Sequence, residues 1–68
     1  MNKNQMFLET ISSIERDIIL GSIARHYNIS RYEAFDEVVD DKAEDLLEYL
    51  TGSYRKVAFI LMKRYGYT

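Results

Sequence analysis

The sequence contains no cysteine, no proline and no tryptophan, and only three glycines among its 68 residues. Without cysteine the chain can form neither a disulfide nor a thiolate metal site, and we expect no metal and no cofactor. Without proline, only Gly21, Gly52 and Gly66 are strong candidates for ending a helix. A chain of this length lies near the lower limit for a stable core, so self-association is the expected source of additional buried surface.

Long hydrophobic runs are also missing. The longest fully apolar run, from Val57 to Met62, is far shorter than the roughly 20 residues that a membrane span needs. The first residues, MNKNQMFLETI, carry one lysine and no apolar segment typical of a signal peptide. We therefore expect a cytoplasmic protein with no membrane association. No linker or repeat divides the sequence, so residues 1–68 are expected to form a single α-helical domain.

Apolar residues recur every three or four positions along most of the chain, which is the period of an α-helix. Ser12 with Glu15 has the spacing of a capping box, so residues 4–27 are expected to form one bent helix or two in close succession. Ser30 with Glu33 has the same spacing and follows Asn28, which can end a helix in the left-handed conformation. The predicted fold is all-α, a small compact bundle of three to four short helices. Its expected core residues are Phe7, Ile11, Ile14, Ile18, Ile19, Leu20, Ile23, Ala24, Tyr27, Tyr32, Phe35, Val39, Ala43, Leu46, Leu50, Tyr54, Val57, Ala58, Leu61, Met62 and Tyr65.

The segment from Ser30 to Leu50 is the most strongly amphipathic part of the sequence. Its unbroken apolar stripe favours one helix from Arg31 to Leu50, although Asp40 or Asp41 could begin a new helix there. From Glu33 to Glu48 there are eight acids and one lysine, a formal charge of about −7. Gly52 is expected to end this helix, and the chain after it has four bases and no acid. Ser53 is expected to cap a last helix that runs from Tyr54 to about Tyr65.

The acidic side of this segment allows three interpretations. In the first, it is simply a solvated helix face, and part of its charge meets the adjacent basic helix. In the second, it binds a basic surface of a partner protein, for example by imitating the charge of nucleic acid. A divalent metal site is the least supported, because no Asp-x-Asp-x-Asp-Gly loop is present. The candidate partner-binding residues are Glu33, Asp36, Glu37, Asp40, Asp41, Glu44 and Glu48.

Residues 20–39 read LGSIARHYNISRYEAFDEVV, with Ile23-Ala24, then Asn28-Ile29-Ser30, then Ala34 to Val38. In this arrangement the segment resembles the helix-turn-helix core of bacterial and phage regulators, which implies a DNA-binding transcriptional regulator as an alternative function. The second helix departs from that pattern, because four carboxylates accompany a single arginine where phosphates would lie. DNA binding would instead have to use Arg25, Arg31, Arg55, Lys56 and Arg64.

The last segment interleaves basic and aromatic residues. Phe59 and Ile60 lie outside its expected core stripe and are flanked by Lys56 and Lys63. These four residues form the expected self-association contact, or a contact with another protein. Contacts of the segment's bases and tyrosines with nucleic acid are a second interpretation.

Catalysis has little support in the sequence. The single histidine, His26, belongs to no recognisable nucleophile motif, and no phosphate loop or zinc-binding spacing is present. We expect a non-enzymatic protein–protein interaction or regulatory module with a basic protein partner, similar in type to accessory products of phages and mobile elements.

Overall fold

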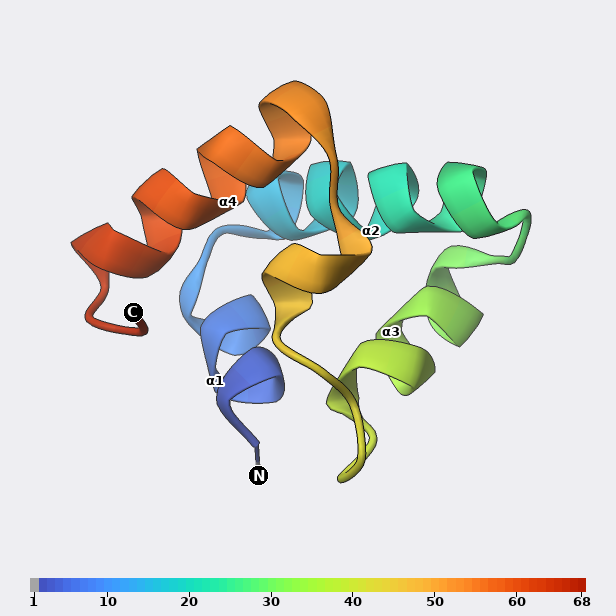
Figure 1. The fold of residues 1–68 in the computed structure, drawn as a ribbon, viewed down its shortest axis with the longest axis horizontal. Coiled ribbons are helices and arrows are strands. Elements are labelled where there is room, and N and C mark those ends of the chain that lie inside the picture. Colours follow the sequence, from blue (N-terminus) through green and yellow to red (C-terminus); the bar gives the residue numbers. More distant parts are fainter. Residues whose placement is uncertain (1) are drawn as a thin grey trace.

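The computed structural model describes residues 2–68, which form four α-helices and one short 3-10 helix around a common core (Figure 1). α2 packs against α3 and α4, while α1 packs against α3 and the 3-10 helix η1 packs against α4. No strand occurs within these residues, so the expected all-α bundle is confirmed. Every helix within residues 2–68 is too short or too polar to cross a bilayer. The elements are α1 (Lys3–Thr10), α2 (Ser13–Tyr27), α3 (Arg31–Val39), η1 (Leu46–Tyr49) and α4 (Gly52–Arg64).

Two capping boxes fix the helix starts that the sequence predicts. The Ser12 hydroxyl accepts a hydrogen bond from the Glu15 amide at 3.1 Å, and the Glu15 carboxylate accepts one from the Ser12 amide at 2.9 Å. Ser30 and Glu33 repeat this arrangement at the start of α3. Between them Asn28 ends α2 with a left-handed backbone, at φ 56°. Residues 4–27 therefore form two helices and not one bent helix.

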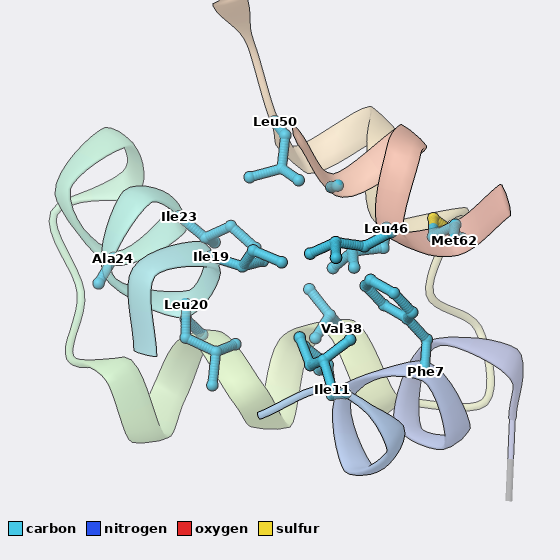
Figure 2. Packing of buried hydrophobic residues seen from close by; sticks show 14 residues of the cluster. Phe7, Ile11, Ile19, Leu20, Ile23, Ala24, Val38, Leu46, Leu50 and Met62 are labelled. Carbon is cyan, nitrogen blue, oxygen red and sulfur yellow. The ribbon is translucent and has the colours of Figure 1, made fainter. Parts of the chain in front are cut away.

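The core gathers one or more side chains from every element. Figure 2 shows Ile19 and Ile23 of α2 pointing toward Phe7 of α1, Val38 of α3 and Leu46 of η1. All five side chains are essentially inaccessible to solvent. The buried hydrophobic residues are Phe7, Leu8, Ile11, Ile19, Leu20, Ile23, Ala24, Ala34, Val38, Leu46, Leu50, Ala58, Leu61 and Met62.

Part of the predicted core is wrong. Ile14 is 72% exposed and Tyr32 is 86% exposed, because the buried sides of α2 and α3 lie on the opposite sides of their helices. The stripe that joins Phe7 and Ile11 to Ile14 does not continue, since the helix restarts at Ser12 in a new direction. The other predicted core residues that are exposed are Ile18, Tyr27, Tyr54, Val57 and Tyr65.

The predicted continuous helix from Arg31 to Leu50 is also wrong. α3 ends at Val39, and Asp40 has an extended backbone with its side chain accepting a hydrogen bond from the Lys42 amide at 2.8 Å. Residues 40–49, here called the returning segment, then turn back and include η1, which Asp45 caps through the Leu47 amide. Neither Asp40 nor Asp41 begins a helix.

Asn4 of α1 supplies the physical reason for this break. Its side chain is buried, with 4% exposed, and its amide nitrogen donates to the carbonyls of Val38 at 2.8 Å and Glu44 at 2.7 Å. Its side-chain oxygen accepts from the Leu46 amide at 3.0 Å. Three backbone groups from α3, the loop and η1 are thus paired by one side chain, which replaces the helical hydrogen bonds that the break removes.

The last helix begins at a glycine in the left-handed region, and a second such glycine follows its end. Gly52 has φ 56° directly after the N-cap residue Thr51, so Ser53 lies within the first turn and is not the cap that the sequence predicts. Gly66 has φ 80° and follows the end of α4, as expected.

Candidate functional site

The break after Val39 arranges the predicted acidic residues on two adjacent segments. Figure 1 shows the returning segment running back beside α3. A shared hollow of about 260 Å³ is lined by Glu37 of α3 and by four residues after it, Asp40, Lys42, Ala43 and Tyr49. Partial burial raises the pKa of the Tyr49 hydroxyl, and the charges of Glu37 and Glu44 raise it further. The shared lining of this hollow places Glu37 of α3 beside the returning segment.

We use the name acidic surface for the seven predicted carboxylates, all of which are exposed. Two of them have local structural roles, since Glu33 belongs to a capping box and Asp40 accepts a hydrogen bond in the turn. The other five accept no side-chain hydrogen bond and form no ion pair within residues 2–68: they are Asp36, Glu37, Asp41, Glu44 and Glu48.

The basic residues of α4 do not neutralise the acidic surface by direct contact. Within residues 2–68 the ion pairs are Lys3 with Asp45, and Arg31 with Asp17 at 4.0 Å. The expectation that part of the charge of the acidic and basic helices meets within the chain is thus not supported by any ion pair among residues 2–68, although η1, which carries Glu48, packs against α4. No three of the described histidine and carboxylate side chains are close enough to form a candidate metal site.

The hairpin of α2 and α3 has the short turn of a helix-turn-helix, but its second helix presents Tyr32 and Asp36 to solvent. The five candidate DNA-binding bases are not brought together. Arg25 and Arg31 both lie against Gly21, while the other three point in different directions around α4. Those three are Arg55, Lys56 and Arg64, all exposed.

The candidate self-association residues do share one side of α4. Phe59 and Ile60 are exposed, and Lys56 and Lys63 lie between them on the side opposite the buried residues of this helix. The ammonium group of Lys63 lies 5.8 Å from the centre of the Phe59 ring. This geometry agrees with an outward-facing contact surface, whose use stays a prediction.

Sequence reasoning missed two features that position these surfaces. One is Asn4, whose hydrogen bonds connect α1 to residues more than thirty positions away. Such bonds cannot be recognised from the spacing of nearby residues in the sequence. The other is the exposure of Ile14 and Ile18 on α2, for which the Ser12 capping box was the available signal. A helix that restarts at Ser12 need not bury the same stripe as the helix before it.

Comparisons with protein-family models, with curated proteins and with solved structures found no match to this chain. Any function must therefore be argued from the chemistry of the acidic surface and of the exposed helix faces. Of these, the acidic surface carries the larger concentration of unpaired charge.

Proposed function

We propose that this protein is a small, non-enzymatic interaction module that binds a basic surface of another protein through its acidic surface. The observation that carries the proposal is the set of five exposed carboxylates that neither cap a helix nor form an ion pair within residues 2–68. Carboxylates without internal partners are free to pair with the lysines and arginines of another molecule.

The arrangement supports binding because the carboxylates of the two segments are held at fixed positions relative to one another. The buried Asn4 side chain bonds to both α3 and the returning segment, so the two groups of carboxylates have a set separation. Their common sign raises the rate of encounter with a basic partner, an effect that falls as salt is added. Tyr32, one helical turn before Asp36, offers an exposed aromatic ring beside the charge, and tyrosine is enriched in protein interfaces.

The outward side of α4 is the second contact surface of the proposed module. Phe59 and Ile60 supply apolar area, and Lys56 and Lys63 would define its charge. A protein with one acidic and one basic contact surface could connect two partners, which is a role typical of small regulatory proteins.

The test uses the protein as bait for binding partners in parallel with charge-reversed variants. The control combines Ser13→Lys with Thr68→Lys, which changes the net charge by the same amount as Glu44→Lys at two exposed residues outside the acidic surface. Proteins retained by the unmodified chain and by this control should be lost by Glu44→Lys, and more completely by Glu37→Lys combined with Glu44→Lys. Equal retention by all variants, with helix content unchanged in circular dichroism, would rule out the acidic surface.

A DNA-binding regulator is the alternative that the α2–α3 hairpin supports. It would use Arg25 and Arg31, which lie side by side over Gly21, because the exposed side of α3 repels phosphate. Binding to duplex DNA that disappears in Arg25→Ala combined with Arg31→Ala, and persists in Glu44→Lys, would favour this alternative over the protein-binding module.

A further inference from the structure

A hollow of about 630 Å³ opens between α2 and α3, and part of its lining is apolar. Leu20 of α2, a core residue that points toward α3 in Figure 2, and the half-buried Phe35 of α3 form its floor. The ring of Tyr32, which is 86% exposed, lines the same hollow. We call it the α2–α3 hollow. An apolar floor beside an exposed aromatic ring is typical of a site that receives one side chain of a binding partner.

The α2–α3 hollow is continuous with the acidic surface, because Asp36 belongs to both. Glu9 of α1 and Asp17 of α2 also line it, together with two arginines. Three carboxylates and two guanidinium groups give this lining a formal charge of −1. The hollow therefore has the same sign of charge as the surface that it adjoins.

The two arginines are held by groups of the chain itself. The Arg16 guanidinium donates a hydrogen bond to the carbonyl of Leu8 at 3.3 Å, and Arg31 has the carboxylate of Asp17 at 4.0 Å. Asp36 and Glu9 form no ion pair within residues 2–68. The carboxylates without a cation thus lie on the α1 and α3 sides of the hollow, where a basic ligand can reach them.

We propose that a basic segment of the partner protein inserts one aromatic side chain into the α2–α3 hollow while its lysines or arginines contact the acidic surface. This inference rests on the proposed function and specifies the side chains that the partner must carry. The inserted ring lies against Leu20, Phe35 and Tyr32, and burial of its apolar area adds affinity that charge alone does not supply. A neighbouring base of the partner pairs with Asp36 at the edge that the hollow shares with the acidic surface.

An aromatic side chain suits this lining better than an aliphatic one. Contacts between its ring and those of Tyr32 and Phe35 add attraction beyond the burial of area. The guanidinium groups of Arg16 and Arg31 also interact favourably with the face of an aromatic ring, whereas an aliphatic chain would only remove water from them. The mixture of aromatic rings and arginines is therefore the reason to name an aromatic residue.

The test compares two peptides of equal length and equal arginine content, one with a central tryptophan and one with serine in its place. The protein has no tryptophan, so indole fluorescence reports the peptide alone. The tryptophan peptide should bind about 10-fold more tightly in calorimetry, and its emission should move to shorter wavelength as the ring leaves water. A third peptide keeps the tryptophan but carries glutamine in place of every arginine, and it should bind at least about 10-fold more weakly than the tryptophan peptide with arginine.

Tyr32→Ala is the main variant and Tyr65→Ala is its matched control. Both rings are exposed, so circular dichroism should show unchanged helix content, but Tyr65 does not line the hollow. Tyr32→Ala should reduce the advantage of the tryptophan peptide to about two-fold, and Tyr65→Ala should leave it at about 10-fold. Glu44 also lies outside the hollow, so Glu44→Lys should weaken both arginine peptides equally and preserve the advantage.

The outcomes separate this inference from the proposed function. Equal binding of the two arginine peptides, both weakened by Glu44→Lys, would overturn the inserted aromatic side chain and leave the proposed function standing. A tryptophan advantage that survives Tyr32→Ala would also overturn it, because the ring would then bind elsewhere. Equal binding of the glutamine peptide would show that the ligand need not be basic, and binding of neither arginine peptide would contradict both proposals.

Discussion

Replacing Asn4 should be among the most damaging single substitutions in this protein. Its side chain forms three hydrogen bonds, to the carbonyls of Val38 and Glu44 and to the amide of Leu46. In Asn4→Ala these bonds are lost, and the backbone groups of Val38 and Leu46 are left buried without partners. The Glu44 carbonyl is only partly buried, so water can reach it more readily.

The expected loss follows from these three bonds. A hydrogen bond contributes about 1 kcal/mol net, and a buried group left unpaired costs about 1–3 kcal/mol, so Asn4→Ala should cost about 3–5 kcal/mol. A chain of this length has a total stability of about 3–10 kcal/mol, so the variant should be largely or partly unfolded. Asn4→Asp should be no better, because its carboxylate keeps the acceptor for Leu46 but faces two carbonyl oxygens without a proton to donate.

Urea unfolding followed by far-ultraviolet circular dichroism measures this loss, with tyrosine fluorescence as a second probe. Gln5→Ala is the matched control, because Gln5 is adjacent on α1 and its side-chain amide has only a 3.5 Å contact with Glu9. It should change the free energy of unfolding by less than about 0.5 kcal/mol. If Asn4→Ala costs less than about 1 kcal/mol, then Asn4 does not hold the break between α3 and the returning segment.

Three further predictions test other parts of the structure. Partial burial raises the pKa of Asp45, but hydrogen bonds, of which the one from Lys3 is the largest, outweigh this effect and hold the pKa below its ordinary value. Asp45→Asn should therefore lower the free energy of unfolding at about pH 6. In urea titrations, the difference from the unmodified chain should vanish as the pH falls to about 2. At concentrations where the chain is monomeric, Ile14→Ala should change the free energy of unfolding by less than about 0.5 kcal/mol, whereas Ile23→Ala should cost about 3 kcal/mol; equal effects would contradict the assigned core. Asn28→Ala should cost about 1 kcal/mol in thermal unfolding because of the left-handed backbone, and Asn28→Gly should be nearly neutral; a neutral alanine would argue against that backbone conformation.

The sequence predicted the features of the fold that depend on nearby residues. Both capping boxes join residues three positions apart, so the starts of α2 and α3 at Ser13 and Arg31 can be read directly from the chain. Asn28 likewise ends α2 through its own backbone conformation. The all-α class follows from the same short-range periodicity.

The errors arose where distant residues decide the structure. The apolar stripe from Tyr32 to Leu50 suits one helix, but Asn4 pairs with the backbone at Val38, Glu44 and Leu46 and so stabilises a turn instead. Periodicity also cannot say which stripe of a helix is covered, and burial of Ala34 and Val38 leaves Tyr32 exposed. The residues of the acidic surface were thus identified from the sequence, but their arrangement on two segments required the structure.

The most direct test of the central claim, that α3 and the returning segment form one surface for a basic partner, is an amide NMR titration of the isotope-labelled chain with an arginine-rich peptide. The amides of Asp36 and Glu37 on α3 should shift together with those of Glu44 and Glu48, with one common affinity that falls as salt is raised. Shifts confined to one of the two segments, or centred on α4, would contradict the claim.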